Sequence, residues 1–159
     1  MATVELSFSA LPVHVRTARL VAVAVARRAG VDEALLDEVR LAVGEACSRA
    51  VHLHRRHCPQ NPVRIVLNDA PPGFEVVVHD KAPVGEPEEG LDALDDLAEA
   101  IELAAPLPAG IGLAVVSSLV DDVHVMTGES GAVVTMRWPV LSPPVPPSHL
   151  PMTLRSTRP

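Results

Sequence analysis

Residues 33–57 read EALLDEVRLAVGEACSRAVHLHRRH, and this stretch decides the fold class. Its apolar side chains recur every three or four residues, the spacing of one helical face: Leu35, Val39, Ala42, Ala46, Ala50 and Leu53. Asp32 stands before the stretch as a suitable N-cap, and Cys58-Pro59 follows it. We therefore expect a helix from Glu33 to about His57, with its apolar face packed against another layer.

The segments on either side of this helix alternate in blocks. Before it, residues 11–29 are rich in Ala, Val and Arg and contain no glycine, which predicts a helix closed by Gly30. A third helix is expected to run from Gly110 to Leu119. The predicted strands are residues 3–8, 63–67, 74–79, 123–126 and 132–138. Because strands and helices are grouped, the pattern favours an α+β fold, a two-layer sandwich with helices on one face of a mixed, mostly antiparallel sheet.

Composition excludes several classes of function. The chain has 159 residues, enough for one domain with a real core, and carries a net charge of −7, which argues against a binder of nucleic acid. Two Phe, one Trp and no Tyr leave no aromatic platform for bases. The apolar run of residues 20–26 is too short to cross a membrane. Two isolated cysteines, Cys47 and Cys58, suggest a reduced cytoplasmic protein.

The acidity belongs to one segment of the chain. Residues 86–102 contain eight acidic residues and no basic one, with a possible helix over residues 91–103. We expect a domain over residues 1–139 that includes an acidic lid region at residues 85–108. Residues 140–159 are rich in proline and are expected to form a tail outside the domain.

Three positions could carry chemistry. Glu45 and Arg49 are four residues apart on the second helix and therefore share a face; they form either an ordinary surface pair or part of a site. Asp80 directly follows a predicted strand, where a carboxylate either starts a turn or contacts a ligand. Gly110-Ile111-Gly112 precedes a helix, an arrangement that lets the backbone approach a phosphate.

A histidine-rich group ends the second helix. His52, His54, His57 and Cys58 include a pair spaced like helical metal ligands. Arg55 and Arg56 lie between them, and cationic groups are favoured at a helix C-terminus in any case. We therefore expect no metal site here and keep metal or small-ligand binding as the alternative.

Taken in order, these segments resemble the anti-sigma factor serine/threonine kinases of the GHKL ATPase superfamily, which have the Bergerat fold. The resemblance covers about residues 3–138. It is carried by Phe8-Ser9-Ala10-Leu11 with Ala18-Arg19, by Val39 to Ser48, by Asp80, by Gly110-Ile111-Gly112-Leu113, and by Val120-Asp121-Asp122 with the terminal hairpin.

The resemblance implies an ATP-binding protein that sequesters a sigma factor in sporulation or stress regulation and phosphorylates a STAS-type anti-anti-sigma partner. It assigns Glu45 as the general base and Asp80 as the acceptor for the adenine amino group. Gly110 and Gly112 would hold the phosphates, and Arg19 would contact partner proteins. A homodimer is also implied, and residues 3–8 form an expected edge strand with few protective charges.

The chain departs from the family pattern at three places. Arg49 stands where the family has the asparagine that ligates Mg²⁺, and a guanidinium offers only donors. Ala82 and Val84 replace glycines after Asp80, and Ala132 replaces a threonine. Arg49 would either pair with Glu45 or point into the cleft and neutralise phosphate charge. Two functions follow: an active kinase, or a partner-binding regulator with weak or no ATP turnover and little use of Mg²⁺.

Overall fold

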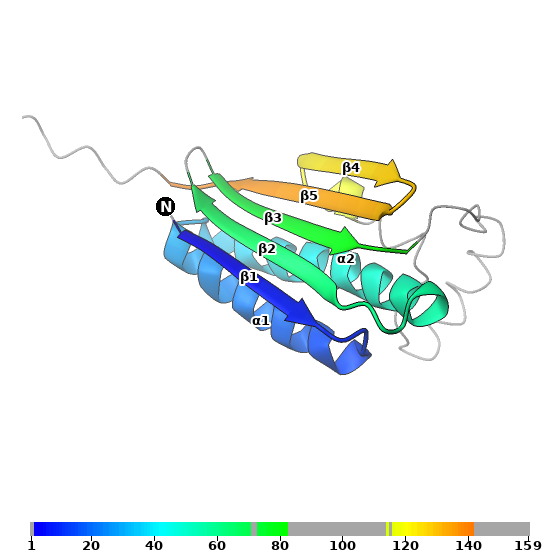
Figure 1. The fold of residues 1–159 in the computed structure, drawn as a ribbon. Coiled ribbons are helices and arrows are strands. Elements are labelled where there is room, and N and C mark those ends of the chain that lie inside the picture. The colour runs from blue at the N-terminus through cyan, green and yellow to red at the C-terminus, as the bar shows by residue number, and fades with distance from the viewer. Residues whose placement is uncertain (1, 71–72, 83–113, 115, 142–159) are drawn as a thin grey trace, which may run out of the picture.

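The computed structural model describes residues 2–70, 73–82, 114 and 116–141. Two long helices, α1 (Pro12–Ala29) and α2 (Leu36–His57), lie side by side on one face of a five-stranded sheet, as Figure 1 shows. A single turn of 3₁₀ helix, η1 (Glu33–Leu35), leads into α2, and residues 116–119 are helical. This arrangement confirms the expected α+β sandwich.

The sheet consists of β1 (Ala2–Phe8), β2 (Val63–Ala70), β3 (Gly73–Asp80), β4 (Asp122–Gly128) and β5 (Gly131–Pro139). Its strand order is β1-β2-β3-β5-β4, and all four described pairings are antiparallel. The order places β1 at an edge, as its sequence predicts. It also places β5 beside β3, so the start of the terminal hairpin strand lies against the end of β3 at Asp80.

The helix boundaries follow from their caps. Gly30 ends α1 in the left-handed conformation (φ 93°), a backbone geometry that costs glycine little. The Asp32 carboxylate accepts a hydrogen bond of 2.9 Å from the backbone N–H of Ala34. That cap closes a 3₁₀ turn rather than an α-helical one, so α2 begins at Leu36, three residues later than the apolar spacing predicts.

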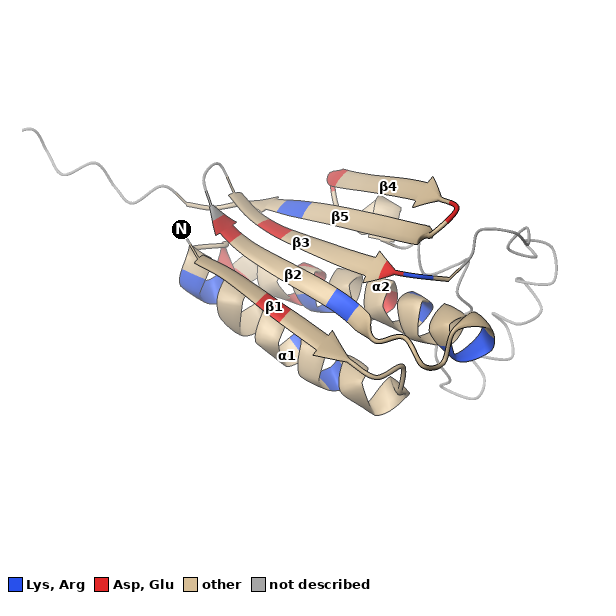
Figure 2. Cartoon of the chain, viewed as in Figure 1, with Lys and Arg blue, Asp and Glu red and all other residues tan. Residues whose placement is uncertain are grey.

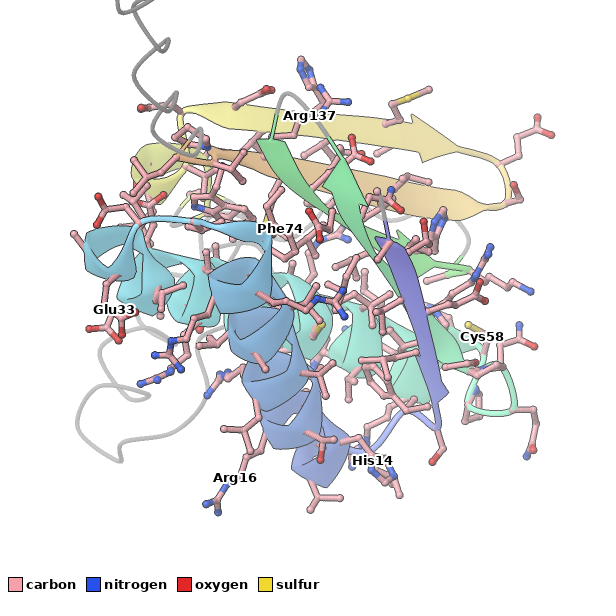
Figure 3. All side chains as sticks on the ribbon, turned by 90° about the vertical axis from the view of Figure 1, so that its left-hand side faces the viewer. His14, Arg16, Glu33, Cys58, Phe74 and Arg137 are labelled. Carbon is pink, nitrogen blue, oxygen red and sulfur yellow. The ribbon has the colours of Figure 1, made fainter. Side chains whose placement is uncertain are left out.

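The core lies between the helices and the sheet and is built mainly from small aliphatic residues. Ala18, Ala22 and Ala26 of α1 are almost fully buried, which lets the two helices pack closely. The two large aromatic residues of the core, Phe74 and Trp138, contact each other from neighbouring strands, and Figure 3 shows Phe74 between the sheet and the helices. The indole N–H of Trp138 donates to Glu38 of α2 at 2.8 Å, which ties β5 to the helical layer.

On the outer face of the sheet, a row of polar side chains crosses all five strands. Thr3, Asn68, Glu75, Arg137 and Asp122 follow one another from β1 to β4 through contacts of 3.0, 2.9, 2.7 and 3.8 Å. Figure 2 shows acidic and basic residues interspersed on these strands. A row of this kind favours one register, because a shift of one residue would turn these groups toward the core.

Several predicted features lie outside the described residues. They are the acidic segment over residues 85–108 with its possible helix, the glycines Gly110 and Gly112, and nearly all of the Pro-rich tail. Within the described residues, neither long helix has an apolar stretch that could cross a bilayer.

Candidate functional site

An ion pair between α2 and the end of β3 forms the centre of the site. Nη1 of Arg49 donates to Oδ2 of Asp80 at 2.8 Å, and the two side chains are only 9% and 3% exposed. The two residues are far apart in sequence, but α2 packs against β3 and brings them together. The sequence left two positions open for Arg49, a pair with Glu45 or a place in a nucleotide cleft. The structure pairs it with Asp80, and its place relative to a nucleotide stays a prediction.

The second oxygen of Asp80 is also engaged. Oδ1 accepts hydrogen bonds from the backbone N–H of Ala82 at 3.1 Å and from that of Ala132 at 3.2 Å. Gly131 allows this approach of β5. It has a φ of +122°, and a Cβ there would lie 2.8 Å from the Asp80 carbonyl carbon and overlap its oxygen. The Asp80 carboxylate therefore accepts three hydrogen bonds from the protein itself.

His54 fastens the residue that follows Asp80. This side chain is fully buried on α2, and its Nε2 accepts a 2.8 Å hydrogen bond from the backbone N–H of Lys81. Nδ1 lies 2.9 Å from the carbonyl oxygen of Asn61 and must be the donor in that contact. His54 is therefore the neutral Nδ1–H tautomer in this arrangement, and it links α2 to the residues just before β2 and just after β3.

Glu45 lies one turn before Arg49 in a different setting. Its side chain is buried, and burial raises the pKa of the carboxyl group, while the positive charge of Arg19 lowers it. Arg19 reaches this region from α1, where its guanidinium lies against Gly44. The pKa of the neighbouring Cys47 thiol is raised to about 12 by full burial, so that thiol is neutral.

The structure thus divides the predicted site residues into two groups. Arg49 meets Asp80, and Arg19 lies near Glu45; Gly110 and Gly112 are outside the described residues. The general-base role of Glu45 and the nucleotide roles of Asp80 and Arg49 stay predictions, as does the partner role of Arg19.

The histidine-rich group does not converge on one point. Both ring nitrogens of His54 are used by backbone groups, while His52 and His57 are exposed to solvent. Across the described residues, no three His, Cys, Asp or Glu side chains are grouped as a metal site would need. In this arrangement neither ring nitrogen of His54 is open to a metal ion, and Cys58 is partly exposed.

Sequence reasoning missed three contributors to this region: His54 as a backbone acceptor, Gly44 as the contact for Arg19, and the N–H of Ala132. Ala132 attracted attention because its side chain is not a threonine, yet its contribution is a backbone donor. The predicted strands could have indicated this donor, because pairing β3 with β5 in this register sets Asp80 opposite Ala132.

Comparison with known proteins identifies the family of the chain. Residues 8–138 match the family model of the histidine kinase-like ATPase domain. This match covers most of the chain, and the chain therefore belongs to the histidine kinase-like ATPase domain family. No curated protein sequence matches the chain.

A solved structure has a similar fold. The structure of the RsbU and RsbW domains of Rv1364c from Mycobacterium tuberculosis superposes with a TM-score of 0.61 at 17% sequence identity. The match covers 90% of this chain and 34% of that one, so this chain spans about a third of the length of its neighbour. At this identity the likeness concerns the fold.

Proposed function

We propose that this chain is a regulator of the anti-sigma type that binds protein partners through a histidine kinase-like ATPase domain and does not turn over ATP. The partners are those the family resemblance implies, a sigma factor and a STAS-type anti-anti-sigma protein. The observation that carries the second half of the proposal is the buried ion pair between Arg49 and Asp80.

The residues present fit a nucleotide poorly. In the family pattern, the carboxylate at the Asp80 position accepts a hydrogen bond from the adenine amino group. Here Arg49 and the backbone N–H groups of Ala82 and Ala132 already donate to that carboxylate, so an adenine amino group would have to compete with the buried ion pair. Breaking a buried ion pair costs about 3–5 kcal/mol, so an adenine that disrupted this pair would lose about two to four orders of magnitude in affinity.

The donor set is equally unsuited to Mg²⁺. Arg49 occupies the position of the metal-ligating asparagine, and a guanidinium has no acceptor atom for a cation. Its charge is instead directed to Asp80. Arg49 and Asp80 therefore hold α2 and β3 together.

The test is isothermal titration of the full chain with ATP and ADP, with and without Mg²⁺. We expect binding too weak to measure at micromolar protein and no effect of Mg²⁺. Arg49→Asn, which frees Asp80 and restores an oxygen ligand, should gain affinity and Mg²⁺ dependence. Tight, Mg²⁺-dependent binding by the unmodified chain would overturn the proposal, as would a failure to bind any sigma factor or STAS-type protein of the source organism.

Glu45 favours a second candidate, phosphorylation of the STAS-type partner. Its carboxyl group is buried, its pKa is raised, and it stands at the position of the family's general base. A carboxylate whose pKa moves toward neutrality is a better proton acceptor at physiological pH. Transfer of labelled phosphate from ATP to a STAS-type protein, lost in Glu45→Gln, would establish this candidate in place of the first.

A further inference from the structure

Arg19 occupies an unusual place at the contact between the two helices. Its guanidinium lies directly over Gly44 of α2, so that a Cβ at this position would come within 2.7 Å of both Cζ and Nη2 of Arg19. Any residue other than glycine at position 44 would occupy the space that the guanidinium fills. Gly44 is therefore the site on which this side chain rests.

The head group of Arg19 is incompletely satisfied there. Its Nε is buried and has no hydrogen-bond partner. A buried donor without a partner costs roughly 1–3 kcal/mol, more for a charged group, so something must favour the guanidinium in this position. Hydrogen bonds to this nitrogen do not supply that stabilisation.

A buried acid lies next to Gly44 on α2. Glu45 adjoins Gly44, its side chain is 8% exposed, and within the described residues no cation lies close enough to form a salt bridge with it. The charge of Arg19 acts on Glu45 and on Cys47, and lowers the pKa of both against the effect of burial. Cys47 is a neutral thiol, and Arg49 pairs with Asp80. The ionisation that depends on the charge of Arg19 is therefore that of the Glu45 carboxyl group.

We propose that Arg19 is a positioning residue for Glu45: seated on Gly44, its guanidinium supplies the positive charge that the buried carboxylate lacks. Under this arrangement the glycine, the arginine and the glutamate act as one unit, in which Gly44 fixes the position of the guanidinium and Arg19 favours the charged form of Glu45 against the effect of burial. The inference stands apart from the proposed function, since the charge of Glu45 can be measured with neither nucleotide nor partner present.

Two substitutions test the charge of Arg19 and its position over Gly44 separately. Arg19→Gln removes the positive charge. Gly44→Ala keeps Arg19 and displaces only its guanidinium, which is the flexible end of a side chain, and alanine is a better helix former than glycine. The matched controls are Arg16→Gln, an exposed arginine that Figure 3 shows pointing away from α1, and Gly128→Ala, where a Cβ would meet nothing within 4 Å.

The readout is the titration of the Glu45 carboxyl carbon by NMR in the full chain, assigned by its loss in Glu45→Gln. We expect the titration midpoint to rise in both Arg19→Gln and Gly44→Ala and to stay unchanged in both controls. Arg19→Lys should return the midpoint toward that of the unmodified chain, which a purely structural role of the side chain would not do.

An unchanged midpoint in Arg19→Gln overturns the proposal. A rise in Arg19→Gln without one in Gly44→Ala overturns the role of Gly44. Circular dichroism and the emission of Trp138 show whether each variant is folded; should Gly44→Ala fail to fold, the comparison of Arg19→Gln with Arg19→Lys decides the question alone.

Discussion

Removing the positive charge at position 49 is the most direct test of the structure. Arg49→Met keeps a long apolar stem and leaves the Asp80 carboxylate buried without its counter-ion. Such a loss costs about 3–5 kcal/mol. Two backbone N–H groups still support Asp80, so we expect the lower end, about 3 kcal/mol, a large part of the 5–15 kcal/mol typical of a domain.

Urea unfolding followed by tryptophan fluorescence measures this change. The chain has one tryptophan, Trp138, and it is 2% exposed, so its emission reports loss of the core. Arg64→Met is the matched control because Arg64 and Glu5 form a two-bond pair of similar distances, 2.6 and 2.8 Å, with both side chains about half exposed. A pair so open to solvent should contribute far less.

A second substitution distinguishes the lost charge from lost packing. Asp80→Asn in the Arg49→Met background removes the buried charge and retains an oxygen that can accept from the N–H groups of Ala82 and Ala132. We expect it to recover part of the lost stability. If Arg49→Met costs no more than Arg64→Met, the pair is not buried as described, Asp80 is available to a nucleotide, and the proposed function loses its main support.

Two further predictions concern titratable groups. Because burial raises the pKa of Glu45 above its usual 4.5, the folded chain binds that proton more tightly than the unfolded one. Stability should therefore fall as the pH rises from below 4.5 through the raised pKa, and Glu45→Gln should reduce this fall in urea midpoints measured across pH. Cys47, buried and with a thiol pKa of about 12, should resist a thiol reagent in the folded chain, whereas the partly exposed Cys58 should react; equal reaction rates would contradict the packing of α2.

Much of the fold could be predicted from the sequence because its signals are local. The periodicity of α2, the glycine after α1 and the alternation of the strands depend on residues close together in the chain, and the structure confirms these elements. The start of α2 could not be located to the residue, because Asp32 can cap either a 3₁₀ or an α-helical turn and both satisfy the same N–H group.

The candidate site, like the fold, could be predicted from the sequence only where its signals are local. The sequence by itself determined the candidates Glu45, Arg49 and Asp80 and the family to which the chain belongs, because these rest on residue type and order. Only the tertiary structure decided that Arg49 meets Asp80 rather than Glu45, and that Arg19 rests on Gly44. These contacts depend on how α2 crosses β3 and how closely α1 approaches α2. Packing sets those distances, and buried charges then pair with whichever opposite charge the packing brings near.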